Sequence, residues 1–182
     1  ILFSGAMVRA LLDGRKTQTR RLASSPCAAW QPGDLLYVRE AWRTDKERED
    51  LKPSWLEQGR DRIWFEADRD NCEAHGRLRP GIHMPRWASR LTLLLRDVTI
   101  SPLRSISSMD AEAEGVERHY AARGWRHYSK PSLWCASPEH SFETLWNSLH
   151  DKAGERWTDN PDVVALTFEV FHGNVAVLGE LE

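Results

Sequence analysis

The chain has 182 residues and a formal net charge of -2 at pH 7. That length favours one domain, with or without a sizeable insertion, and suffices for a hydrophobic core without disulfides or structural metals. The charge excludes a strongly basic molecule, so any surface that binds nucleic acid must be a local patch.

The sequence carries few signals for a cellular compartment or a membrane. Three scattered cysteines are too few for a disulfide framework, which favours a reducing compartment. Residues 1–10 lack a charged start and a small-residue cleavage pattern, so we expect no signal peptide. No apolar run reaches the ~18 residues that a membrane span needs. We therefore expect a cytoplasmic protein without a membrane segment.

The first half of the chain predicts a helix and two strands. Residues 4–13 form an apolar stripe between a capping serine and Gly14, as in a short helix. The turn Pro32-Gly33-Asp34 introduces a strand at 35–38, and 63–65 form another. The charged residues 43–62 are expected to be an exposed excursion.

The second half predicts a long strand, two helices and a closing strand. Leucines alternate through residues 91–100, which favours a strand. Ser107 with Asp110 starts one helix, and Ser137-Pro138 starts another. Residues 118–136 show no periodicity and are expected to be loop, before a strand at 163–170. This order favours an α+β fold, a small mixed β-barrel with flanking helices, over a doubly wound sheet.

The segment from Gly14 to Arg21 carries four cations in seven residues, with Thr17, Gln18 and Thr19 between them. Cations at a helix C-terminus are electrostatically favoured, so helix capping explains part of the cluster. The alternative is the rim of a phosphate or nucleotide site, where Arg supplies a planar fork of donors and Lys a point charge.

This segment resembles the Gly-x-Lys-x-x-Thr-x-Arg signature of the ASCH group of the PUA-like fold. Gly14, Lys16, Thr19 and Arg21 fall on its fixed positions. Residues 32–38, 106–116, 142–146 and 164–168 are similar to further motifs of the family, in the family's order. Three strings, at residues 2–5, 37–42 and 83–90, are similar to the uncharacterised ASCH-like proteins of bacteriophages and prophages. The resemblance implies one PUA-like domain over 1–182, with insertions at about 43–81 and 117–136.

The resemblance also implies two functions. PUA-like domains typically bind RNA or modified bases. One ASCH branch hydrolyses the acetyl amide of N4-acetylcytidine, and its proposed catalytic group corresponds here to Lys16, Thr19 and Glu114 as base, nucleophile and proton carrier. Such chemistry is reasonable, because a desolvated lysine can serve as a base for a hydroxyl nucleophile.

A second group of candidates lies outside the signature. His83, Arg86 and Trp87 bring a titrating ring, a guanidinium and a stacking face together, although Trp87 can equally fill a core and Arg86 pair with an acid. Arg39 precedes Glu40, and in a strand only one of the two would face a cleft. The predicted ligand-binding residues are Arg15, Arg21, Arg39, His83, Arg86 and Trp87.

Metal and cofactor sites are not expected. Cys72 and His75 have a ligand-like spacing, but no second clean pair completes a zinc set. The first hypothesis is therefore binding of single-stranded nucleic acid or a modified nucleoside, with RNA favoured over DNA, in a basic cleft. The alternatives are an amidohydrolase acting on an acylated nucleobase, and a phage accessory protein that binds a protein partner through Trp-rich loops.

Overall fold

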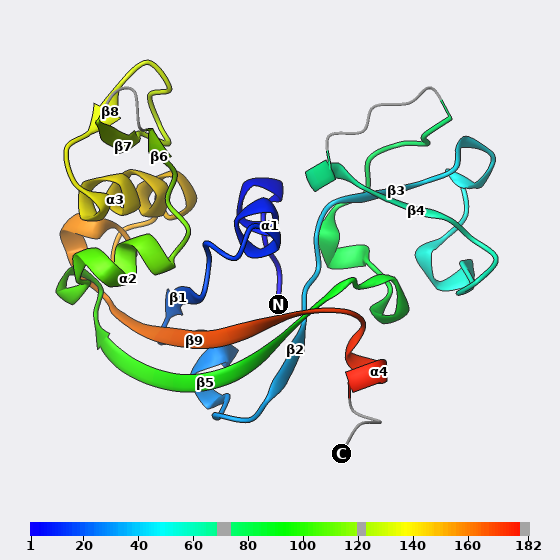
Figure 1. Ribbon diagram of the computed structural model, residues 1–182, viewed down its shortest axis with the longest axis horizontal. Helices are drawn as coiled ribbons and strands as arrows, with labels where there is room; N and C mark the ends of the chain where they lie inside the picture. Colours follow the sequence, from blue (N-terminus) through cyan, green and yellow to red (C-terminus); the bar gives the residue numbers. More distant parts are fainter. Residues whose placement is uncertain (69–73, 120–122, 179–182) are drawn as a thin grey trace. The chain divides into compact units, whose positions relative to one another are not determined.

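The computed structural model describes residues 1–68, 74–119 and 123–178. It is an α+β fold with antiparallel strand pairing in every register that is described. The chain divides into two compact units, one made of Ile1–Asp13, Leu35–Leu94 and Val170–Glu182, the other of Gly14–Asp34 and Leu95–Glu169. The strands β5 (Leu91–Pro102) and β9 (Asp162–His172) run through both units (Figure 1).

The first unit begins with α1 (Gly5–Leu12) and ends with α4 (Val175–Leu178). Its strand β2 (Leu35–Tyr37) pairs with the start of β5, and β3 (Trp42–Thr44) pairs with β4 (Ile63–Phe65). In the described part of this unit, short 3-10 turns connect these elements: Lys46–Arg48, Pro53–Trp55, Glu66–Asp68, Gly81–His83 and Arg86–Ala88. One hydrophobic cluster of this unit is formed by Trp42, Leu56, Met84 and Ala88.

In the second unit, β1 (Gln18–Leu22) pairs with β9. The helices α2 (Ser108–Ala113) and α3 (Pro138–Leu149) pack together, and α3 also contacts the small sheet of β6 (Arg118–His119), β7 (Gly124–Arg126) and β8 (Trp134–Cys135) (Figure 1). The 3-10 turns of this unit are Pro26–Ala29, Leu103–Ser105 and Trp157–Asp159. Its core includes Trp125, Cys135, Phe142, Trp146 and Val163.

Several elements match the sequence-based expectations. The hydroxyl of Ser107 accepts a hydrogen bond from the N–H of Asp110 at 3.1 Å, and Ser137 accepts one from His140 at 3.3 Å, so both predicted helices begin with a bonded N-cap. The strand expected at 91–100 is β5, an interior strand of the sheet with order β1-β9-β5-β2. That order places β1 and β2 at the two ends, and no closed barrel is part of the topology of the described residues.

Three stretches differ from what the sequence pattern indicates. Residues 118–136 contain β6, β7 and β8 where a loop was expected. Residues 43–62 are not wholly an excursion, because β3 extends to Thr44 and pairs with β4. The signature segment contains β1, which was not predicted as a strand. The strands β1 and β3 pair with partners distant in sequence, which local periodicity cannot reveal, and β6, β7 and β8 are only two or three residues long, too short to show an alternating pattern.

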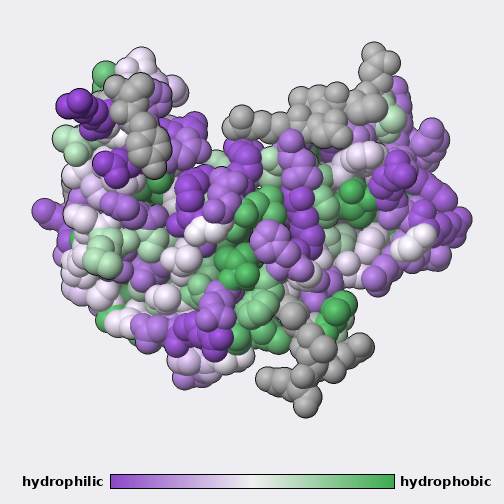
Figure 2. All heavy atoms as spheres, viewed as in Figure 1, coloured by the Kyte–Doolittle hydropathy of each residue, from purple (hydrophilic) through white to green (hydrophobic). Residues whose placement is uncertain are grey.

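The surface is largely polar. Figure 2 shows hydrophilic residues over much of the visible face, with smaller hydrophobic patches between them, and the mean hydropathy of the chain is -0.57. Within residues 1–68, 74–119 and 123–178, no helix combines the length and apolar character that a membrane span requires.

Candidate functional site

The signature segment enters the second unit through a turn and continues as an edge strand. Gly14 has a φ of 70°, the left-handed conformation that glycine adopts at little cost. The N–H of Thr17 donates to the carbonyl of Ala113 at 2.9 Å, and the carbonyl of Thr17 accepts from Phe168 at 2.9 Å. These bonds fix the segment between the end of α2 and β9.

Lys16 and Glu114 form a buried ion pair where these elements meet. The ammonium Nζ lies 2.8 Å from Glu114 Oε2, 2.7 Å from the Glu114 carbonyl and 2.7 Å from the Gln18 carbonyl. Lys16 is only 1% exposed and Glu114 only 3%. Burial lowers the pKa of Lys16, while the Glu114 carboxylate acts in the opposite direction. Three acceptors match the three N–H donors of an ammonium, so this geometry suits the charged lysine.

Arg20 extends this pair into a network. Its guanidinium lies 3.3 Å from Glu114 Oε1 and 3.3 Å from Asp110 Oδ2, and it also donates to the side-chain oxygen of Gln18. The Gln18 amide in turn donates to Asp110 Oδ1 at 3.3 Å and to Thr167 at 3.1 Å. Burial acts to raise the pKa of Asp110, but the hydrogen bond from Ser107 and the charge of Arg20 outweigh it and lower that pKa. The network holds each polar group in one orientation.

A polar pocket of about 270 Å³ opens beside this network, wholly within the second unit. Alternation along β1 directs Gln18 and Arg20 to it, and the same alternation along β5 directs residues 97, 99 and 101 to it. Its charged groups are two carboxylates and one guanidinium, so the lining is mixed and not basic. The residues that line it are Gln18, Arg20, Asp97, Thr99, Ser101, Ser105, Asp110 and Ala165.

Three further residues of the signature segment, Arg15, Thr19 and Arg21, make their hydrogen bonds away from this pocket. Thr19 is buried on the face of β1 opposite Gln18 and Arg20, and its hydroxyl accepts from Arg21 Nη1 at 2.8 Å. Arg21 also donates to the carbonyl of Arg20 at 2.9 Å, and burial lowers the pKa of Arg21. Arg15 is exposed and donates to the carbonyl of Gly115 at 3.2 Å. Arg15 and Lys16 thus bind carbonyls at the C-terminal end of α2.

The remaining predicted ligand residues belong to the first unit. Arg39 and Arg86 each place the guanidinium over the ring of Tyr37, at 5.9 and 5.7 Å from the ring centroid. Arg86 forms no ion pair with any residue the structure describes. Trp87 is half-buried against the hydrophobic cluster around Trp42. His83 is exposed and lines a different pocket, formed within the first unit.

Of the two neighbours Arg39 and Glu40, Glu40 is the one that is buried. Glu40 is 1% exposed and forms an ion pair with Arg90 at 2.9 Å. Arg90 also pairs with Asp68 at 2.8 Å. Burial raises the pKa of Glu40, and Arg90 partly offsets this. Sequence reasoning offered no partner for this carboxylate.

Sequence analysis selected none of the residues that line this pocket as site residues, and a signal was available for Gln18 and Arg20. The available signal was the spacing of Lys16, Gln18 and Arg20 at every second position, as on one face of a strand. Asp110 was noted only for its position in the helix cap. For metal, Cys72 lies outside the described residues, and no group of three or more His, Cys, Asp or Glu side chains that could hold an ion occurs within the described part of the chain.

Comparisons with known proteins found no match: no family model, no curated protein and no solved structure matches this chain.

Proposed function

We propose that the polar pocket of the second unit binds a nucleoside, free or within single-stranded RNA, and that the chain is a PUA-like protein of the ASCH group. The observation that carries this proposal is a pocket whose polar side chains are oriented by the buried Lys16–Glu114–Arg20 network. The contact between Lys16 and Glu114 also supports the resemblance, because the family's proposed catalytic group combines the signature lysine with a glutamate of the acidic helix, which are far apart in sequence. The PUA-like assignment of the fold and the cytoplasmic location remain part of this proposal.

The chemistry of the lining favours a base and a sugar over phosphate. Arg20 supplies N–H donors, and Asp97 and Asp110 supply acceptor oxygens. Three lining residues carry hydroxyls: Thr99 donates to Asp97 at 2.7 Å and Ser105 to the carbonyl of Pro102 at 2.7 Å, so both can accept from a ligand, and the third is Ser101. Proteins read unstacked bases through such edge contacts, and hydroxyl contacts distinguish ribose from deoxyribose. Phosphate contacts instead require mainly Lys and Arg. Pockets for drug-sized ligands usually have volumes of roughly 300 Å³ or more. The volume of this pocket, about 270 Å³, lies slightly below that range and therefore suits a small molecule.

Titration calorimetry with cytidine, N4-acetylcytidine, uridine and the deoxy counterparts tests the proposal. We expect a ribonucleoside to bind, with an affinity that changes little between low and moderate salt, because no phosphate is involved. Asp110→Asn removes an acceptor while keeping the shape of the side chain, and should weaken binding about tenfold.

Arg96→Ala is the matched control, because Arg96 neighbours Asp97 on β5, pairs with Glu169 at 2.7 Å and does not line the pocket. It should leave the affinity unchanged. If neither a nucleoside nor a single-stranded RNA binds, or if Asp110→Asn has no effect, the pocket is not the binding site.

The second candidate is hydrolysis of an acylated nucleobase by Lys16, Thr19 and Glu114. Its support is the burial of Lys16, which lowers the pKa of this lysine as a general base requires. The position of Thr19 on the other face of β1 is less favourable to it.

A further inference from the structure

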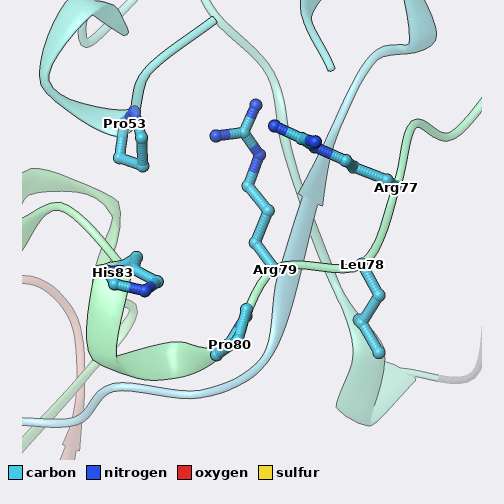
Figure 3. Close-up of a pocket in the computed structure, with 6 residues that line it drawn as sticks. All are labelled: Pro53, Arg77, Leu78, Arg79, Pro80 and His83. Carbon is cyan, nitrogen blue, oxygen red and sulfur yellow. The ribbon is translucent and has the colours of Figure 1, made fainter. Parts of the chain in front are cut away.

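A second pocket lies wholly within the first unit and contains none of the signature residues. Its volume is about 390 Å³. Figure 3 shows Arg79 extending into the middle of the view, with the guanidinium of Arg77 beside its own and with His83 and Pro53 across from it. Pro80 and Leu78 complete the lining. The pocket therefore combines cationic groups with an apolar wall.

Arg79 is held rigidly at this site. Its backbone exchanges hydrogen bonds with Trp42, at 2.8 and 3.0 Å, and its guanidinium carbon lies 5.0 Å from the centroid of the Trp42 ring. Its Nη2 donates to the carbonyls of Arg48 at 3.2 Å and Glu49 at 2.8 Å. The side chain is thus fixed by one aromatic face and two neutral acceptors.

The charge of Arg79 has no carboxylate partner. Arg79 is 5% exposed, forms no ion pair with any residue in the described ranges, and its Nε–H has no acceptor there. Glu49 is near, but its carboxylate accepts from the backbone N–H of Arg77 at 2.9 Å. Burial and the charge of Arg77 lower the pKa of Arg79, whereas Asp50 and Glu49 act against this at longer range. A buried cation without a partner is costly, and a bound anion offsets that cost.

The remaining lining indicates what else the ligand carries. Arg77 and His83 are exposed and add donors at the mouth of the pocket. Pro53, Leu78 and Pro80 present apolar surface, and Leu78 is 47% exposed although hydrophobic. A free inorganic anion would use only the cationic part of this lining, whereas an organic anion would cover both parts.

We propose that this pocket binds a small organic oxyanion, a carboxylate or a phosphate monoester attached to an apolar body, with Arg79 as the central contact. This site is separate from the nucleoside pocket, and the failure of either proposal leaves the other standing.

Four probes divide the ligand into its parts: phenyl phosphate, benzoate, inorganic phosphate and phenol. Calorimetry measures affinity, and the NMR resonance of the Arg79 Nε–Hε group reports the location. We expect phenyl phosphate or benzoate to bind and to shift that resonance, and the tighter of the two identifies the head group. We expect inorganic phosphate and phenol to bind more weakly than the tighter of these two probes. Equal binding of phenol would exclude an anion site, and equal binding of inorganic phosphate would exclude the apolar contact.

Variants of single arginines test whether the probes bind in this pocket. Arg77→Ala should weaken binding about two- to fivefold, as expected for one exposed charge, and Arg79→Gln should weaken it at least about tenfold. Since Arg79→Gln can disturb folding, Arg77→Ala and the resonance shift in the unmodified protein keep the proposal testable. Arg62→Ala is the control, because Arg62 is exposed in the same unit, stacks on Trp64 at 5.1 Å and does not line the pocket. Equal losses for Arg62→Ala and Arg77→Ala would overturn the assignment.

Discussion

The ammonium of Lys16 lies 2.8 Å from the carboxylate of Glu114, across a separation of 98 positions in the sequence. Both side chains are almost completely buried, and Arg20 contacts the second oxygen of the same carboxylate. One anion thus serves two buried cations, which makes Glu114 the residue on which the local charge balance depends.

Glu114→Gln should lower the free energy of unfolding by about 3–5 kcal/mol, because the buried ammonium of Lys16 loses the charge of the Glu114 carboxylate, while Arg20 keeps its contact with Asp110. Urea denaturation followed by circular dichroism measures this change. The control is Glu117→Gln, since Glu117 pairs with Arg126 at 2.7 Å but both side chains are more than a third exposed. That change should cost at most about 1 kcal/mol. Similar losses in the two variants would contradict the assigned role of Glu114.

Tyr128 should ionise late in an alkaline titration. Burial raises the pKa of Tyr128 to about 12, while the N–H of Glu117, which donates to its hydroxyl at 3.1 Å, acts in the opposite direction. Between about pH 10 and 12 the folded state then holds a proton that the unfolded state has released, so stability should fall as the pH rises through this range. Below pH 10 the group should have no effect.

Absorbance at the phenolate band measures this ionisation. We expect a late ionisation step that Tyr128→Phe removes. Loss of an early step instead would show that the hydroxyl of Tyr128 is solvated.

Ser137→Ala should lower the free energy of unfolding by about 1 kcal/mol, because the serine side chain caps α3. Ser4→Ala is the matched control: Ser4 occupies the N-cap position of α1, but its side chain makes no cap hydrogen bond. Thermal or urea unfolding of the two variants compares them directly. A larger loss for Ser4→Ala would mean that the caps are assigned incorrectly.

Incubation with N4-acetylcytidine separates binding from hydrolysis. We expect the nucleoside to be bound without release of the free amine, because the three acceptors around Lys16 favour its protonated form, which is a poor base. Chromatography of the products detects turnover. Turnover that is lost in Thr19→Val and in Lys16→Met, in variants that remain folded, would support the amidohydrolase candidate against this expectation.

Local signals in the sequence determined the elements that rest on local physics. Ser137 followed by Pro138 predicted the start of α3, and the alternating leucines from Leu91 predicted β5. Caps and alternation act within a few residues, so they can be read without a partner. The sequence also selected Lys16, through its resemblance to a family signature, and Glu114, through the similarity of its helix to the family's acidic helix.

Only the tertiary structure decided which of these residues meet. Lys16 contacts Glu114, which is distant along the chain, and Gln18 and Arg20 lie beside a pocket whose other walls come from later segments. Trp125 pairs with Cys135 in a small sheet whose sequence has no periodic pattern. The sequence equally could not show that Arg79 has no ion pair among the described residues, because acids lie nearby in the sequence and only the folded chain turns Glu49 toward the backbone of Arg77. Burial and orientation are properties of the packed chain, and neither a motif nor a spacing along the sequence specifies them.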